Sequence, residues 1–282
     1  MTLPAGFDLD DFVRRVLAED LGSGGDVTSN ATIDADARFT ATMNGRQQLV
    51  VAGLDIAAAF FRALDAEVEI ELLATDGDAA DAGSLLMRLS GNARGMLTAE
   101  RSALNTLQHL SGIATLTRTY VDAIAETGAV LLDTRKTIPG LRVLEKYATR
   151  MGGAQNHRMR LDDGVLIKDN HVAVCGGVSE AVRRAKHANT GLQVQVEVDR
   201  VDQIEPALGA GADRLLLDNM PPSVLREAVG RVAGRVPLEA SGGVSLDTIR
   251  AIAETGVDYI SLGRITQSAP AVDIGLDYAV SR

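Results

Sequence analysis

Cysteine, tryptophan and long apolar runs are scarce or absent in this sequence of 282 residues. Its single cysteine, Cys175, excludes an internal disulfide and any metal site built on several cysteines, and indicates a reducing compartment. Tryptophan is absent and aromatic residues make up 3%, which disfavours platforms that stack nucleic-acid bases. No apolar run approaches the ~18 residues of a membrane span. Residues 1–11 lack the basic and apolar stretches of a signal peptide, so we expect a cytoplasmic protein.

The length and charge of the chain narrow the class further. At ~150 residues per domain, 282 residues predict about two domains, each able to bury a core without disulfides. The net charge is −10, which disfavours a general nucleic-acid binder because phosphate requires a basic surface. Glycine is frequent, with 28 residues that cluster after apolar runs, a placement typical of tight turns or phosphate-binding loops.

Charge is distributed unevenly along the chain. Residues 1–115 contain eight Arg, no Lys and seventeen Asp or Glu. Residues 135–168, by contrast, hold eight cations opposed by three carboxylates, a net charge of +5. Such a basic stretch in an acidic protein indicates either an anion-binding site or a solvated basic face.

The first part of the chain predicts mixed α and β structure. Apolar periodicity predicts helices over 8–19 and 54–64, and a helix that begins near Thr98 as its N-cap. Strand-like segments occupy 39–43, 68–73 and 84–89. Arg101 projects from the polar side of the helix after Thr98, which suits a surface cation or a binding residue.

The second part alternates short apolar runs with segments of helical length. The predicted strands are 129–132, 165–167, 194–196, 215–217, 236–238 and 259–262, and the predicted helices are 141–151, 178–187, 201–208, 223–232 and 246–255. Repeated strand–helix units predict a parallel sheet with right-handed crossovers. Six units favour an incomplete (β/α) barrel, with a doubly wound sheet as the competing architecture.

Polar residues follow each of these predicted strands. Because functional groups in parallel α/β folds project from the carboxyl ends of strands, we expect them to meet at one mouth. The strand ends and a nearby loop supply Asp133-Thr134-Arg135-Lys136, Asn156-His157-Arg158, Lys168-Asp169-Asn170, Glu197, Asp218-Asn219, Glu239-Ala240-Ser241 and Gly263-Arg264. Several cations together favour a ligand with more than one negative charge, and two carboxylates suit ribose hydroxyls or Mg²⁺ on a polyphosphate. The loop at Gly242-Gly243 precedes a predicted helix and suits a phosphate.

Other chemistries have weaker support. Lys136 or Lys168 could form a Schiff base, but neighbouring cations would suppress the charge of its amine only in part. His109 and His187 lack metal-ligand spacing and are interpreted as helix or surface residues, and Cys175 as a buried or turn residue.

Several long motifs resemble one family. They are Arg101-Ser-Ala-Leu-Asn-Thr-Leu-Gln-His-Leu-Ser-Gly, Leu132-Asp-Thr-Arg-Lys-Thr-Ile-Pro-Gly, Asn156-His-Arg, Leu166-Ile-Lys-Asp-Asn-His, Leu217-Asp-Asn, Glu239-Ala-Ser-Gly-Gly and Ser261-Leu-Gly. The chain resembles quinolinate phosphoribosyltransferases in these motifs, over almost its whole length. The resemblance implies conversion of quinolinate and phosphoribosyl pyrophosphate, with Mg²⁺, to nicotinate mononucleotide, pyrophosphate and CO₂, a step of NAD biosynthesis. It also implies an N-terminal α/β sandwich over 1–115, and over 116–282 an incomplete barrel whose last helix packs back on the first domain.

The resemblance assigns residues to this reaction. Lys136, Lys168, Glu197 and Asp218 are expected to be catalytic, with Mg²⁺ near the two carboxylates. Substrate binding is expected from Arg101, Thr134, Arg135, Lys136, His157, Arg158, Lys168, Glu197, Asp218, Ser241, Gly242, Gly243, Ser261 and Gly263. The minimal unit implied is a homodimer in which Arg101 reaches the neighbour's site.

Departures and alternatives remain beside this interpretation. Arg160, Asp199 and Gln267 differ from residues common in the family, and a related branch associated with molybdenum transport genes shares the motifs. A sugar-phosphate lyase or isomerase that uses Lys168 as a base, and a non-catalytic anion-binding barrel, are the alternatives from other functional classes.

Overall fold

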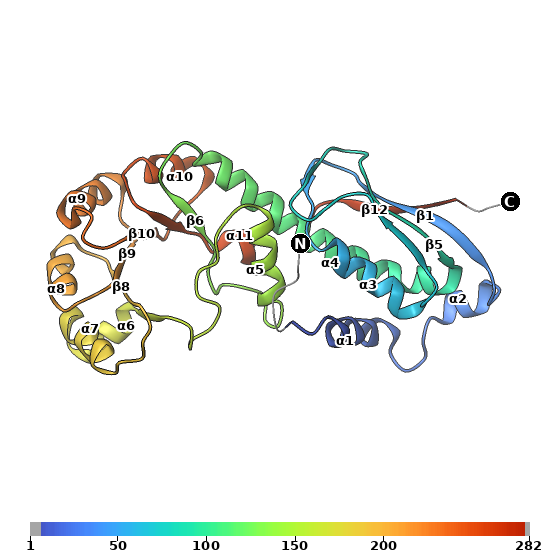
Figure 1. Cartoon of the computed structure of the whole chain (residues 1–282), viewed down its shortest axis with the longest axis horizontal. Helices are drawn as coiled ribbons and strands as arrows, with labels where there is room; N and C mark the ends of the chain where they lie inside the picture. The colour runs from blue at the N-terminus through green and yellow to red at the C-terminus, as the bar shows by residue number, and fades with distance from the viewer. Residues whose placement is uncertain (1–6, 280–282) are drawn as a thin grey trace. The chain divides into compact units, whose positions relative to one another are not determined.

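The computed structural model describes residues 7–279 and divides the chain into two compact units (Figure 1). The first unit comprises Met1–Arg118, Val143–Gly153 and Ala269–Arg282, and the second comprises Thr119–Arg142 and Ala154–Ser268. Two segments from the second half of the chain therefore belong to the first unit. A prediction of contiguous domains at 1–115 and 116–282 could not include them, because the packing of distant segments leaves no local pattern.

The first unit is built on a four-stranded antiparallel sheet in the order β12-β1-β5-β3. Its strands are β1 (Arg38–Gly45), β3 (Glu69–Leu72), β5 (Leu85–Asn92) and β12 (Ile274–Ala279), and the short strands β2 (Leu49–Val50) and β4 (Ala79–Ala80) pair separately. Met43 on β1 stands opposite both Met87 on β5 and Leu276 on β12, which aligns buried residues across the sheet. The last element is therefore a strand, and the expectation of a final helix is wrong.

Helices complete the first unit. They are α1 (Leu9–Leu21), α2 (Val27–Thr32), α3 (Leu54–Leu64), α4 (Ala93–Ala123), whose last residues belong to the second unit, and α5 (Arg142–Met151), which lies mostly in the first. Asp8 caps α1 by accepting a hydrogen bond from the Asp11 amide at 2.9 Å. Thr98, predicted as an N-cap, lies inside α4, where its hydroxyl donates to the Arg94 carbonyl. The N-cap prediction is wrong because hydroxyl residues also form this bond within helices.

The second unit contains six parallel strands. They are β6 (Val130–Leu132), β7 (Val165–Ile167), β8 (Val194–Val198), β9 (Arg214–Asp218), β10 (Leu238–Ser241) and β11 (Tyr259–Ser261). The order is β6-β11-β10-β9-β8-β7, so the first strand pairs with the last and the sheet is open between β6 and β7. This cyclic order is that of an incomplete barrel, and it excludes the doubly wound alternative.

Helices follow the strands of the second unit. They are α6 (Asp169–Cys175), α7 (Val178–His187), α8 (Ile204–Gly209), α9 (Pro222–Val232), α10 (Leu246–Ala253) and α11 (Arg264–Gln267), with a 3₁₀ turn η1 (Val201–Gln203) before α8. The sequence correctly predicts α7 and the start of α10, but not the short helices α6 and α11. Strand β10 begins at Leu238, whereas the predicted strand ended there, because Glu239 and Ala240 after an apolar run give no clear strand signal.

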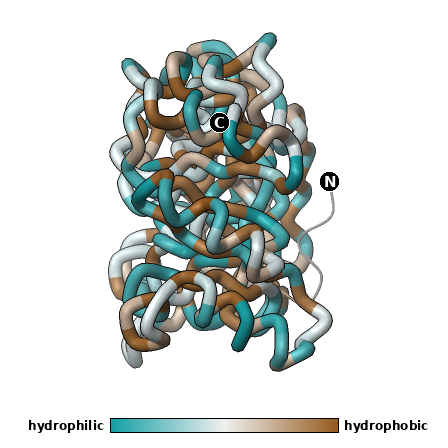
Figure 2. The backbone as a smooth tube through the Cα atoms, turned by 90° about the vertical axis from the view of Figure 1, so that its left-hand side faces the viewer, coloured by the Kyte–Doolittle hydropathy of each residue, from teal (hydrophilic) through white to brown (hydrophobic). Residues whose placement is uncertain are grey.

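Hydrophobic and hydrophilic stretches are interleaved along the backbone (Figure 2). Among the described helices, none combines the length and the apolar character that a membrane span requires.

Candidate functional site

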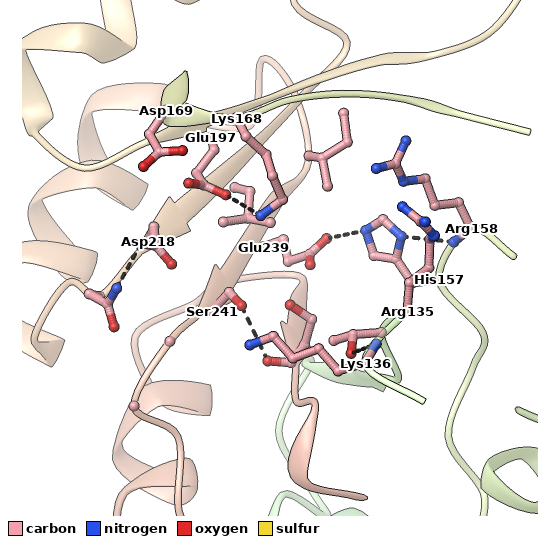
Figure 3. Close-up of a pocket in the computed structure, with 17 residues that line it drawn as sticks. Arg135, Lys136, His157, Arg158, Lys168, Asp169, Glu197, Asp218, Glu239 and Ser241 are labelled. Atoms are coloured by element: carbon pink, nitrogen blue, oxygen red, sulfur yellow. Dashed lines mark hydrogen bonds and ion pairs between the residues drawn. The ribbon is translucent and has the colours of Figure 1, made fainter. Parts of the chain in front are cut away.

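The carboxyl ends of the six parallel strands surround a pocket of about 620 Å³ in the second unit (Figure 3). All six strands contribute to its lining, which combines cations, carboxylates and the glycine loop after β10. The lining residues are Thr134, Arg135, Lys136, His157, Arg158, Leu166, Lys168, Asp169, Glu197, Leu216, Asp218, Asn219, Glu239, Ser241, Gly242, Gly243 and Ser261. Side chains predicted to share one mouth therefore do so.

Asp133 fixes the segment that carries His157. This carboxylate is fully buried directly after β6, and it accepts hydrogen bonds from the His157 amide at 2.8 Å and from the Asn156 side chain at 2.5 Å. The segment also runs beside β6, where Gln155 bridges Leu132. A buried carboxylate with backbone and side-chain donors holds a loop more rigidly than exposed contacts do. The position of His157 at the pocket thus follows from Asp133.

Two arginines lie on the same side of the pocket as His157 (Figure 3). Arg158 donates from Nη1 to the Gly164 carbonyl at 2.9 Å. Burial, aided by the neighbouring charge of Arg135, lowers the pKa of Arg158 below its usual value. The buried Nε of Arg135 has no hydrogen-bond partner within the described part of the chain. Since an unpaired buried donor costs about 1–3 kcal/mol, an anionic ligand would stabilise this arrangement.

Carboxylates occupy the other side of the pocket. Glu197 near the end of β8 has a largely buried side chain, 11% exposed, and its Oε2 lies 3.0 Å from Nζ of Lys168. Asp169 and Asp218 lie on this same side (Figure 3). The Lys168–Glu197 contact is an ion pair, whereas a Schiff-base lysine requires a neutral amine. Arg135 and Arg158 thus lie on one side of the pocket, and these three carboxylates lie on the other.

The loop after β10 approaches the loop after β9 very closely. Asn219 adopts a left-handed conformation (φ +54°), and its side-chain amide donates to Asp218 Oδ2 at 2.6 Å. A Cβ at Gly242 (φ +87°) would lie 2.2 Å from Asn219 Oδ1, so only glycine fits. Ser245 then caps α10, which begins at Leu246. Gly242 and Gly243 line the pocket just before a helix start, a position that suits an anionic ligand.

Lys136 follows β6, the first strand of the sheet, and contacts α11, the helix after the last strand β11. Its carbonyl accepts a hydrogen bond from the Thr266 hydroxyl at 2.7 Å, and its side chain extends toward Ser241 (Figure 3). A Cβ at Gly263 would lie 2.6 Å from Cδ of Lys136. Gly263 therefore makes room for Lys136, although it does not itself line the pocket.

Twelve of the fourteen predicted binding residues line this pocket, and the exceptions are Gly263 and Arg101. Arg101 lies on α4 with a side chain 60% exposed, and the nearest carboxylate is Glu100 at 3.9 Å. The sequence also predicts Asp169, Asn219 and Glu239 at the mouth, as residues at strand ends, and all three line the pocket, although they are not among the predicted binding residues. Leu166 and Leu216 are apolar strand residues, and nothing in the sequence distinguishes them from core.

Residues outside the pocket have ordinary structural roles. Arg160 is exposed and paired with Asp162, and neither Asp199 nor Gln267 lines the pocket, so the departures from the family pattern lie outside it. His109 contacts the buried Glu145 at 2.9 Å. Cys175 is the last residue of α6 and is partly buried. Over residues 7–279 no cluster of three or more His, Cys, Asp or Glu side chains could hold a metal ion by itself.

Comparisons with known proteins agree along the whole chain. Residues 26–111 match the family described as quinolinate phosphoribosyl transferase, N-terminal domain, and residues 113–277 match its C-terminal domain. A relative from Mycobacterium leprae, named nicotinate-nucleotide pyrophosphorylase (carboxylating), is 44% identical over 272 residues, which cover 95% of this chain and 96% of the relative. A probable nicotinate-nucleotide pyrophosphorylase (carboxylating) from Bacillus subtilis is 40% identical over 274 residues, covering 97% and 94%.

A solved structure of nicotinate-nucleotide pyrophosphorylase from Francisella tularensis superposes with a TM-score of 0.93 at 40% identity. The superposition covers 99% of this chain and 100% of the solved chain. Both halves of the sequence and the tertiary structure thus match the same group of proteins. The chain belongs to the quinolinate phosphoribosyl transferase family.

Proposed function

We propose that this protein transfers the phosphoribosyl group of phosphoribosyl pyrophosphate to quinolinate. The products are nicotinate mononucleotide, pyrophosphate and CO₂, in the de novo synthesis of NAD. Relatives with 40–44% identity bear the name of this enzyme. The observation that carries the proposal is the pocket in which arginines face carboxylates (Figure 3). A dianionic pyridine and a sugar that develops positive charge need these two opposite environments.

The arginine side suits quinolinate. Planar guanidinium groups bind carboxylates through paired hydrogen bonds. Arg135 has an unpaired buried Nε, and Arg158 lies beside it, so the two substrate carboxylates have two guanidinium partners. Lys168 and Lys136 add positive charge at the edges of the same space. Truncation of one carboxylate-binding arginine is expected to cost ~2–4 kcal/mol of transition-state binding.

The carboxylate side suits the activated sugar. Glu197 and Asp218 would accept hydrogen bonds from ribose hydroxyls and contact Mg²⁺ bound to the pyrophosphate, which supplies charge to stabilise the leaving group. No resident metal site is needed for this arrangement, since the ion arrives with the substrate. The amides of the Gly242–Gly243 loop and the hydroxyls of Ser241 and Ser261 would bind the 5′-phosphate.

The chemistry requires no activated side chain. The pyridine nitrogen is the nucleophile at the anomeric carbon, and the bond to pyrophosphate breaks with both electrons leaving on oxygen. Positive charge that grows on the ribose is offset by Glu197 and Asp218. The ribosylated ring is then cationic, so C2 can keep the electron pair of the bond that breaks when its carboxylate departs as CO₂, and a proton from solvent adds at C2 to give nicotinate mononucleotide. The protein therefore accelerates the reaction mainly by holding the two anionic substrates in the orientation that the attack requires.

Arg101 enters the proposal through a second copy of the chain. Its exposed guanidinium lies outside the pocket residues, and residues of the same sequence motif resemble the family segment that reaches a neighbour's site. We place it in the partner's pocket in a homodimer, where it would contact quinolinate.

The single cysteine, Cys175, is consistent with the expected cytoplasmic location.

Release of labelled CO₂ from carboxyl-labelled quinolinate tests the activity. The wild-type protein should release CO₂ only with phosphoribosyl pyrophosphate and Mg²⁺ present, and Arg158→Ala should be strongly impaired. Arg183→Ala, on the exposed surface of α7, is the matched control and should be fully active. Absence of CO₂ from the wild type would reject the proposed function.

Mixing two inactive variants tests the shared site. Arg101→Ala and Lys168→Ala should each be inactive, whereas a reassembled equimolar mixture should regain about a quarter of the wild-type activity, because half of the dimers then contain one intact site. Full activity of Arg101→Ala alone, or no recovery in the mixture, would contradict the shared site.

A further inference from the structure

A buried ion pair lies inside the parallel sheet, between Glu239 on β10 and Arg214 on β9. Glu239 is fully buried, and the Arg214 side chain is 17% exposed. Nη2 of Arg214 lies 2.7 Å from Oε2 of Glu239, in an approach that lacks hydrogen-bond geometry and is therefore an ion pair. The guanidinium also lies 3.9 Å from the ring centre of Tyr259 on β11. The two opposite charges form a unit without net charge, fixed by stacking.

His157 is attached to this unit through one ring nitrogen. Its Nε2 lies 3.4 Å from Oε2 of Glu239 (Figure 3). The other ring nitrogen, Nδ1, accepts a hydrogen bond from the Arg158 amide at 2.7 Å. Because the amide can only donate, Nδ1 carries no proton in this arrangement. The ring proton therefore sits on Nε2 and points to Glu239, so both nitrogens are engaged by the protein.

A permanent cation and an amide donor accompany the charge of Glu239. Gln195 donates from Nε2 to Oε2 of Glu239 at 2.8 Å, and Arg214 supplies the positive charge. Burial alone would raise the pKa of Glu239, but its contacts with His157 and Arg214 outweigh burial and lower the pKa. Glu239 thus remains ionised, and Arg214 provides a permanent positive charge beside it.

The other charges near His157 also favour a neutral ring. They come from the segment after β6, from its own loop, from the residue after β7 and from the strands β8, β9 and β10. They are Asp133, Arg135, Lys136, Arg158, Lys168 with its partner Glu197, Arg214 and Glu239. Cations outnumber carboxylates in this set. A further positive charge on His157 would be repelled by more neighbours than attract it.

We infer that Glu239 and Arg214 are positioning residues that hold His157 neutral, with its Nε2–H directed into the protein. His157 then lines the pocket as an uncharged planar surface, and the anionic substrate is bound by Arg135, Lys136, Arg158 and Lys168. Neither Arg214 nor Gln195 has a place in the residues expected from family motifs. The inference rests on the proposed function only in treating the pocket as a substrate site.

Long-range ¹H–¹⁵N correlation spectra of the intact protein test the inference without substrate. The chain has four histidines, and His157→Gln assigns the His157 signals by their loss. At neutral pH the wild type should show an unprotonated Nδ1 and a protonated Nε2. A ring protonated on Nδ1, or on both nitrogens, would overturn the inference whether or not the Arg214 variants fold.

Variants of Arg214 test the coupling. In Arg214→Met the Glu239 carboxylate loses its cation, so His157 should become doubly protonated at neutral pH. Arg214→Lys keeps a cation and should restore the neutral ring, and Arg231→Met, an exposed arginine on α9, is the matched control with an unchanged spectrum. A neutral His157 in folded Arg214→Met would contradict the coupling.

The two proposals fail separately. A wild-type protein that has the stated tautomer but releases no CO₂ would reject the proposed function alone. An active enzyme with a charged His157 would reject only the inference about Glu239 and Arg214.

Discussion

Replacing Gly242 with alanine perturbs the pocket at its tightest point. The new Cβ would lie 2.2 Å from Oδ1 of Asn219, and ordinary contacts of about 3.5 Å require the amide to move by more than an ångström. The side-chain amide of Asn219 donates to Asp218 Oδ2 at 2.6 Å, and its backbone amide donates to the Ser241 carbonyl at 2.8 Å. Movement therefore displaces a carboxylate and a hydroxyl residue that we assign to phosphoribosyl pyrophosphate. An alanine at this position would also carry about 1 kcal/mol of backbone strain, because Gly242 has a positive φ.

Gly234→Ala separates the strain from the clash. Gly234 has a similar conformation (φ +73°), but a Cβ there would meet nothing within 4 Å. Gly234→Ala should lose about 1 kcal/mol of unfolding free energy in urea titrations, and Gly242→Ala should lose more, because the clash with Asn219 adds to the strain. Gly242→Ala alone should raise KM for phosphoribosyl pyrophosphate about tenfold, equivalent to about 1.4 kcal/mol. Quinolinate affinity, measured by calorimetry, should change little in either variant. A wild-type KM in folded Gly242→Ala would refute this reasoning.

Three further predictions concern charge and metal. Lys168→Ala should lower kcat/KM strongly while changing stability by less than about 1 kcal/mol, because the Lys168 side chain is half exposed to solvent; a large fall in Tm would instead indicate a structural lysine. Burial would raise the pKa of Asp213, but the Val194 amide and Lys186 outweigh it and lower the pKa, so this carboxylate stabilises the fold above its unfolded pKa and loses that effect as the pH falls through the folded value. Asp213→Asn should therefore be less stable than the wild type at neutral pH, with a deficit in urea titrations that shrinks below about pH 4; a constant deficit would argue against the linkage. EDTA should abolish activity and leave Tm unchanged, since residues 7–279 hold no cluster suited to a resident metal, and a Tm lowered by several degrees would reveal one.

Local sequence patterns determined the type of most elements in the second unit. Short apolar runs that alternate with amphipathic segments predicted the parallel strands, and α7 begins and ends where expected. Polar residues directly after those runs predicted the pocket, because the ends of parallel strands meet at one edge whatever the rest of the chain does. The motif around Asp133 and Arg135 also carried the family resemblance. These features depend on neighbours in sequence, and a single sequence therefore reveals them.

Tertiary structure decided what depends on partners far away in the chain. The strand β12 joins the sheet of the first unit only because β1 is there to pair with it. From the sequence Thr98 could cap a helix or lie within one, and in the structure it lies within α4. Arg214 and Gln195 occupy strand positions where the sequence shows only an isolated polar residue, and their contact with Glu239 exists only once three strands are aligned. Sequence determined which chemical groups are present, and packing determined which of them meet.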